Sequence, residues 1–367
     1  MDSTESAINP VMVVLARESR GLSQSELAQR LSVTPAALSR VESGLRPCSD
    51  SMLKRLSDAL EYPEGFFRQT DPVFGFGVSE LFHRKFHDVT INTLEMIHAQ
   101  INIRRIHLVR MLRGVEIGKV NIHPIDLEDF SGNPGDVART VRATWRLPHG
   151  PVQNLTKAIE DARVIIIPFD FGTQRIDAIS QWPPGMPPLI FVNVHSPGDR
   201  LRFTICHELG HLVMHQESLD SLIEYQANGF AAEFLMPERD IRPYLENLSL
   251  PMLASLKAVW KVSMAALLKR ATDLGAITQR HARTLWTMMG KAGYRTREPA
   301  ELDIPAETPT FYQEIIDVHR YEMNYGAADL AKMLNLSERD VWHVYLGVPR
   351  HLRPVESFSA GLGGLPR

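Results

Sequence analysis

The segment 207–211 (His-Glu-Leu-Gly-His) restricts the possible folds of this chain more than any other feature of its sequence. On a helix, residues i and i+4 lie on the same face, so both imidazoles can reach a single metal ion. Zinc suits such a pair, because imidazole is a good zinc ligand and a catalytic zinc site keeps one position for water. Glu208 is then placed to take a proton from that water. The sequence therefore predicts a metal-binding helix over about residues 200–216.

Two histidines need a third protein ligand, and the sequence leaves two candidates for it. A third histidine six residues after the second would stand at position 217, where the sequence has glutamate. The next predicted helix, 221–235, supplies Glu224 and Glu233 instead. We prefer Glu224 and expect Glu233 to pack or to cap. Asn228, four residues after Glu224, is expected to support the ligands by a hydrogen bond.

Three short apolar runs before the predicted metal-binding helix have the composition of β-strands. Residues 163–169 (RVIIIPF) are rich in β-branched side chains, residues 176–182 roughly alternate, and residues 188–194 (PLIFVNV) form the third run. Everything after residue 240 looks helical, except the extended stretch 296–309 with its three prolines. The expected fold class is α+β, with a small sheet beside the metal-binding helix.

Near the N-terminus, residues 21–50 have the layout of two short helices joined by a turn. Ser23 and Glu26 fit a capping box at the start of the first helix, in which each side chain accepts from the backbone amide of the other residue. Thr34 can cap the second helix, whose first position holds a proline, a residue tolerated there. Gly44 is suited to end it. This pattern predicts a helix-turn-helix.

The segment 11–66 resembles the Xre/Cro-repressor type of helix-turn-helix domain, whose second helix enters the major groove of DNA. Arg40 is the strongest candidate for reading guanine, and Ala36 could touch a thymine methyl group. Residues 1–70 carry eight Lys and Arg against nine Asp and Glu, so binding should depend on a few placed contacts and on a dimer that reads two operator half-sites. A helical bundle of this shape that binds protein is the alternative. The side chains expected to face DNA are Gln24, Pro35, Ala36, Ser39 and Arg40.

Turn-forming residues and changes of periodicity divide the chain into four predicted regions. The first is all-helical, the third holds the sheet and the metal-binding helix, and the fourth is again helical. Residues 69–79 have the composition of a linker, and apolar positions recur at helical spacing from residue 78 to residue 115. The regions are 1–70 (helix-turn-helix domain), 71–130 (linker and connecting helical segment), 131–245 (metal-binding domain) and 246–367 (helical C-terminal region).

Residues from about 130 to 240 resemble the ImmA/IrrE family of metallopeptidases. The resemblance implies a zincin-like domain that holds Zn²⁺ through His207, His211 and Glu224. It also implies that Glu208 is the catalytic glutamate. The matching pieces are IFVN (190–193), RFTICHELGHLVMH (202–215) and EYQANGFAAEFLMP (224–237).

Several residues around these ligands have more than one interpretation. His215 recurs in the family and is either a residue that hydrogen-bonds to a ligand, which we prefer, or a donor to the transition state. Cys206 stands where the family usually has a small residue, and we expect it to be buried packing rather than a fourth metal ligand. The oxyanion donor could be Tyr225, His215 or His195. An extended peptide would pair with a sheet edge, for which we expect strand 189–194, with Asn193 near its end.

The combination implies a DNA-binding zinc endopeptidase of transcriptional or stress control. Members of the resembling family cleave repressors of the helix-turn-helix type, so the implied substrate is a repressor-type protein, hydrolysed by zinc-bound water with Glu208 as base. One alternative is a transcriptional regulator whose metal site is a sensor or structural element without proteolysis. Another is a toxin–antitoxin or mobile-element control protein that acts by protein binding.

The composition argues against a membrane-spanning, secreted or disulfide-rich protein. Of 367 residues, 44% are hydrophobic and 23% charged, with a net charge of −3, as in ordinary globular proteins. No run approaches the roughly 20 apolar residues that span a bilayer, and the acidic start does not fit a secretory signal. Only Cys48 and Cys206 are present, which gives no disulfide framework. We therefore expect a cytoplasmic protein without membrane partners.

The roles of two segments have two possible interpretations each. Residues 80–120 carry seven Lys and Arg and four His against four acids. They form either a dimerising or effector-sensing arm that restrains the peptidase, or a helix that covers its apolar surface. Residues 327–346 again have two short helices about a Leu-Ser turn, with Ser337 as a cap. We expect a structural helix pair there, with a second DNA- or partner-binding module as the alternative.

Overall fold

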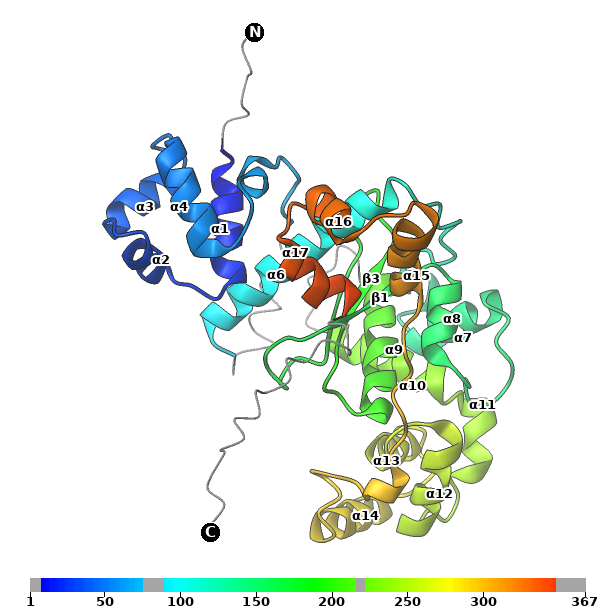
Figure 1. Ribbon diagram of the computed structural model, residues 1–367. Coiled ribbons are helices and arrows are strands. Elements are labelled where there is room, and N and C mark those ends of the chain that lie inside the picture. Colours follow the sequence, from blue (N-terminus) through cyan, green and yellow to red (C-terminus); the bar gives the residue numbers. More distant parts are fainter. Residues whose placement is uncertain (1–7, 75–88, 216–221, 348–367) are drawn as a thin grey trace, which may run out of the picture.

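The computed structural model describes residues 8–74, 89–215 and 222–347, and their fold is α+β (Figure 1). A four-helix N-terminal domain lies at one end of the molecule, and helices α12 to α14 lie at the other. Between them stand one small sheet and the helices that hold the candidate site. The predicted fold class is confirmed.

The sheet has three strands in the order β1-β3-β2. Strands β1 (Ile165–Phe169) and β3 (Leu189–Asn193) are parallel, whereas β2 (Ala178–Gln181) runs antiparallel to β3. All three strands were predicted. The prediction that 189–194 is an edge strand is wrong, because β3 is paired on both sides and lies at the centre of the sheet. Among the described strands, β2 pairs on one side only, and it packs against the helix that was predicted to bind metal.

The sheet separates two hydrophobic cores. Alternate residues of a strand point to opposite faces, so Ile165 and Ile167 enter one core while Ile166 enters the other. The first core also contains residues of the N-terminal domain, of α6 and of the last helices of the chain. The second contains residues of α9, α10 and the helices between residues 250 and 291. The N-terminal domain and the candidate site therefore lie on opposite faces of one sheet.

The N-terminal domain forms as its caps predict. Ser23 accepts from the backbone amide of Glu26, and the Glu26 carboxylate accepts from the amide of Ser23 at 2.7 Å. Thr34 caps the second helix of the motif by accepting from the amide of Ala37 at 3.2 Å. Gly44, just after that helix, has a φ of +72°, which glycine adopts without strain. The elements are α1 (Pro10–Ser19), α2 (Gln24–Arg30), α3 (Pro35–Glu42), α4 (Asp50–Leu60) and the short 3₁₀ helix η1 (Glu64–Arg68).

Helix α6 (Ile91–Leu112) joins this domain to the sheet. The predicted helical segment 78–115 includes it, although residues 75–88, which also hold part of the predicted linker, lie outside the described residues. Apolar residues of α6 are buried in the core shared by the N-terminal domain and the sheet. In addition, the Gln100 amide donates to the Ser19 carbonyl at 2.9 Å. The observed packing is that of a helix that covers an apolar surface, and a fragment lacking residues 1–120 would expose that face of the sheet.

The last helices pack against the same core. Helix α16 (Ala327–Leu334) and helix α17 (Glu338–Val341) flank the predicted turn, and Ser337 accepts from the amide of Asp340. Asp340 also pairs with Arg20 of the N-terminal domain at 3.1 Å. This packing is that of the expected structural helix pair. The neighbouring elements are α15 (Phe311–Asp317) and two π-helical segments, η5 (Val318–Glu322) and η6 (Trp342–Leu346).

The remaining helices surround the second core. Among the described residues, no single helix has the length and apolar character to cross a membrane, although α12 and α13 pass that test jointly as a pair bent by 102°. The α-helices are α7 (Pro134–Thr144), α8 (Leu155–Asp161), α9 (Gly198–Met214), α10 (Ile223–Leu235), α11 (Glu238–Ile241), α12 (Leu250–Trp260), α13 (Met264–Asp273) and α14 (Gln279–Lys291). The 3₁₀ turns are η2 (Leu127–Phe130), η3 (Arg242–Tyr244) and η4 (Ala300–Leu302).

Candidate metal centre and DNA-binding face

Helices α9 and α10 build the candidate metal centre by packing closely against each other. The close approach depends on Gly210 within the His-Glu-Leu-Gly-His segment. A Cβ atom there would lie 3.2 Å from the Phe230 ring of α10, tighter than side chains normally pack. Glycine therefore allows α10 to bring its first turn beside the two histidines of α9.

Three side chains meet at this crossing. The Nε2 atoms of His207 and His211 lie 3.0 Å apart. The carboxylate of Glu224 faces both of them, with one oxygen 3.4 Å from His207 Nε2 and the other 3.4 Å from His211 Nε2. Within the described part of the chain, these residues form the one group of three or more potential ligands whose donor atoms all lie within 4.8 Å of one another. Two imidazoles and one carboxylate are a donor set that suits zinc.

The hydrogen bonds behind the rings fix which nitrogen carries a proton. The Asn228 Oδ1 atom can only accept, so His207 donates to it from Nδ1, at 3.1 Å. Gln226 Oε1 likewise accepts from His215 Nε2 at 2.8 Å. Burial lowers the pKa of His215 to about 4, so this ring is neutral and its Nδ1 accepts from His211 Nδ1 at 3.0 Å.

Both ligand candidates are therefore protonated on Nδ1, and each directs the lone pair of Nε2 towards the other. Two lone pairs 3.0 Å apart, with a carboxylate beside them, repel unless a cation lies between them. The residues present thus fit a metal ion such as Zn²⁺. Gln226, which fixes the first proton in this chain of hydrogen bonds, was not anticipated, because no spacing rule singles it out.

Glu208 lies beside this cluster and is held by the sheet. It is 5% exposed, and its Oε2 accepts a hydrogen bond of 2.6 Å from the Ser180 hydroxyl. Ser180 belongs to β2, against which α9 packs. The sequence did not point to Ser180, because only the tertiary pairing of strand and helix brings it to Glu208.

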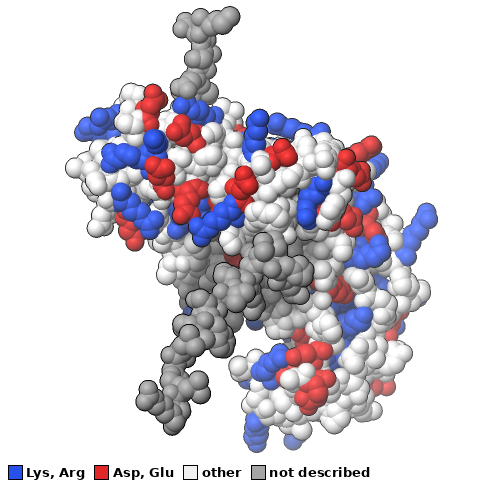
Figure 2. All heavy atoms as spheres, viewed as in Figure 1, with Lys and Arg blue, Asp and Glu red and all other residues white. Residues whose placement is uncertain are grey.

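The face of the N-terminal domain that was expected to meet DNA is largely open. Pro35, Ala36 and Arg40 of α3 are exposed, and Ser39 is half-buried. Gln24 is also half-buried, and its amide donates to Glu42 at 2.8 Å. On the side shown in Figure 2, Lys and Arg alternate with Asp and Glu over this domain and form no continuous basic patch.

Two family models match parts of this chain. The helix-turn-helix family model matches residues 15–67, and the model of peptidase family M78, described as the IrrE N-terminal-like domain, matches residues 159–272. The chain joins an Xre-type helix-turn-helix domain to an IrrE-like peptidase domain. No curated protein matches it. The IrrE-like match includes α9 and α10, and therefore every residue of the candidate metal cluster.

Within the IrrE-like domain, Glu233 is engaged elsewhere. It is 3% exposed, accepts from Arg139 at 2.8 Å and forms a further ion pair with Arg270. Cys206 is fully buried in the second core, and burial raises the pKa of its thiol. Neither residue belongs to the cluster of potential ligands.

Three other residues were candidates for contacts to the substrate or the transition state: Asn193, His215 and Tyr225. Asn193, expected near a substrate-binding edge, instead donates from its amide to the carbonyls of Thr173 and Ile176 at 2.8 and 2.7 Å, so it holds the loop before β2. His215 uses both ring nitrogens for His211 and Gln226. Tyr225, next to Glu224 in the sequence, is 73% exposed, and no hydrogen bond of its hydroxyl is found among the described residues.

Proposed function

We propose that this protein is a DNA-binding zinc endopeptidase of transcriptional control that cuts a repressor-type protein. One observation carries the proposal: two imidazole lone pairs and a carboxylate converge beside a buried glutamate, in a chain that also has a helix-turn-helix domain. A purely structural metal site has no use for Glu208. We place the protein in the cytoplasm, where it can reach DNA.

In this proposal His207, His211 and Glu224 hold the zinc ion. Asn228 and His215 keep the two imidazoles oriented through their Nδ1 atoms, as partners of metal-bound histidines commonly do. When bound, zinc would polarise the scissile carbonyl and lower the pKa of a bound water molecule.

Glu208 acts as the general base and then as the acid. Its carboxylate takes a proton from the attacking water and delivers it to the departing amine. The Ser180 hydroxyl occupies one oxygen of Glu208 and thereby fixes the direction of the other. Among the candidates for the oxyanion donor we favour Tyr225, because His215 already uses both nitrogens and His195 lies beside Asp170.

The substrate would lie along β2. This strand pairs with β3 on one side and carries Ser180, so an extended peptide added to its other edge would pass beside Glu208. Main-chain pairing gives affinity for an extended segment without demanding a particular sequence. An exposed, unfolded loop of a repressor meets this requirement.

The helix-turn-helix domain would bring the peptidase to DNA. Gln24, Pro35, Ala36, Ser39 and Arg40 are the proposed contacts, and Arg40 is the one able to make a bidentate bond to guanine. Each chain has one such α3 helix, so a dimer would read two half-sites of an operator. The protein would either repress from that site itself or find a DNA-bound repressor there.

The test is metal content together with cleavage of a co-expressed helix-turn-helix repressor. The wild type should carry one zinc ion per chain and cleave, while Glu208→Gln should keep the metal and leave the repressor intact. Glu301→Gln, a change of an exposed glutamate in η4, is the matched control and should behave as the wild type. A wild type that holds zinc and cuts none of the repressors encoded near it would favour a metal-dependent regulator without proteolysis.

A further inference from the structure

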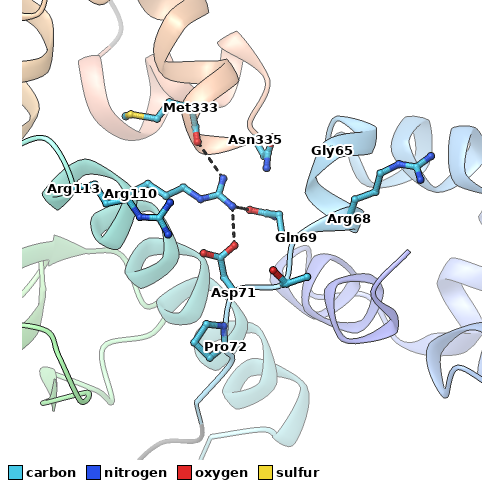
Figure 3. Close-up of a pocket in the computed structure, with 10 residues that line it drawn as sticks. Gly65, Arg68, Gln69, Asp71, Pro72, Arg110, Arg113, Met333 and Asn335 are labelled. Atoms are coloured by element: carbon cyan, nitrogen blue, oxygen red, sulfur yellow. Dashed lines mark hydrogen bonds and ion pairs between the residues drawn. The ribbon is translucent and has the colours of Figure 1, made fainter. Parts of the chain in front are cut away.

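A cavity of about 610 Å³ lies where the N-terminal domain, α6 and α16 meet (Figure 3). Its volume is in the range of sites for small molecules. Its walls come from three parts of the chain: the end of η1 with residues 69–72, the last turn of α6, and the end of α16. None of its lining residues belongs to α9 or α10, so it is separate from the candidate metal centre.

The lining is polar and carries an excess of positive charge. Arg68, Arg110 and Arg113 contribute three cationic groups, and Asp71 is the one acidic side chain among the residues that line it. Arginine is the side chain best suited to bind phosphate and carboxylate groups, because its planar fork can donate two parallel hydrogen bonds.

Arg110 is already fixed in place. It donates to the Asp71 carboxylate at 2.8 Å, to the Gln69 side chain, and to the carbonyl of Met333 at 3.1 Å. Figure 3 shows these bonds running from its guanidinium, on α6, to the other two walls. The floor of the cavity is therefore built before any ligand arrives, which lowers the entropy cost of binding.

Arg113, which directly follows the end of α6, is in a different situation. Its side chain is exposed, and no hydrogen bond or ion pair of its guanidinium is found among the described residues. In Figure 3 it lies on the opposite side of Arg110 from Arg68. Across the cavity, Asn335 ends α16 with a φ of +53°. Its side-chain oxygen would lie 3.0 Å from a Cβ at Gly65, so glycine leaves it room.

We propose that this cavity binds a small organic anion that carries phosphate or clustered carboxylate groups. Arg113 supplies a charge that none of the described residues neutralises, and Asn335 supplies polar contacts from the opposite wall. Because the walls belong to the DNA-binding domain, α6 and α16, the bound anion ties the N-terminal domain to the rest of the molecule. Such a ligand is placed to alter how firmly that domain is held.

A second hollow with basic residues differs from this cavity in the number of elements that line it. It has a volume of about 620 Å³ and contains Arg280, Arg283 and Lys291, but every residue that lines it belongs to the single helix α14. In the described part of the chain no second element contributes to its lining, so it is a face of one helix. It provides a control for anion binding by charge alone.

The experiment uses the full chain and two probes, glycerol 3-phosphate and succinate, at constant ionic strength. Calorimetric titration gives the dissociation constant, and thermal unfolding gives the shift in Tm. We expect saturable binding of one probe, so the pair distinguishes a phosphate from a carboxylate ligand. Arg113→Gln should weaken binding about tenfold, the size of one lost charged hydrogen bond. Arg283→Gln should leave it unchanged.

Three results would overturn the proposal. The first is that neither probe binds saturably to the wild type. The second is that Arg283→Gln weakens binding as much as Arg113→Gln, which would show attraction to general positive charge. The third is that Arg113→Gln weakens binding of a DNA duplex and leaves both probes unaffected, which would make Arg113 a contact to the DNA backbone.

Discussion

Glu224 and Glu233 lie nine residues apart on α10, and the structure gives them opposite roles that a pair of substitutions can separate. Glu233→Gln removes the charge that two arginines share in the protein interior. Arg270 is 8% exposed, so it would lose its ionic partner in a buried place and keep its hydrogen bond to the Met236 carbonyl, at 3.1 Å. Breaking a buried ion pair costs about 3–5 kcal/mol.

The lower end of that range applies here. The side chain of Arg139 is 42% exposed, so water screens its share of the interaction. Glutamine also keeps an oxygen that can accept one of the hydrogen bonds. We therefore expect Glu233→Gln to lower the free energy of unfolding by about 3 kcal/mol, and to leave zinc binding intact.

Glu224→Gln should give the reverse result. The side chain of Glu224 is 45% exposed and faces the two imidazoles, so its loss should change the stability of the metal-free protein by less than about 1 kcal/mol. The variant should lose its zinc on dialysis. The assays are urea unfolding of the metal-free proteins and metal analysis of the dialysed ones. A Glu233→Gln variant that is as stable as the wild type, or that folds but loses zinc, would refute this reasoning.

Three further predictions concern other parts of the molecule. Ser180→Ala should lower kcat about tenfold at unchanged zinc content, because Glu208 loses one charged hydrogen bond, and Ser180→Thr should restore most of it. Arg40→Ala should weaken binding to the operator by about 1–3 kcal/mol in a titration at fixed salt, whereas an equal loss on random DNA would make Arg40 a phosphate contact. Burial first, and then the nearby Arg104 and Arg110, hold the pKa of His107 well below 6.5. The unfolded chain therefore takes up this proton first as the pH falls below about 6.5, so the free energy of unfolding should drop between pH 7 and pH 5, and drop less in His107→Gln.

The sequence predicts those parts of the fold that depend on neighbours along the chain. Ser23 and Thr34 cap their helices because a cap needs only residues two or three positions away. The spacing of His207 and His211 places them on one helical face for the same reason. The three strands were visible in their composition, since β-branched runs suit a buried sheet.

Contacts between segments that lie far apart in the sequence could not be predicted from local patterns. Strand β3 was expected at an edge, but its two partners follow from a strand order that no local pattern encodes. Ser180 reaches Glu208, 28 residues away, only because β2 packs on α9. Gln226 matters because of a chain of hydrogen bonds that passes through His215. Each of these contacts is set by tertiary packing.

The central claim is that Glu208 makes this metal centre hydrolytic. The most direct test compares the new protein N-termini that form in cells producing the wild type with those in cells producing Glu208→Gln, at equal expression and equal zinc content. The account predicts one or a few new N-termini, within a DNA-binding repressor, that appear with the wild type and are absent with Glu208→Gln. Identical sets of N-termini in the two strains, with zinc bound in both proteins, would contradict it.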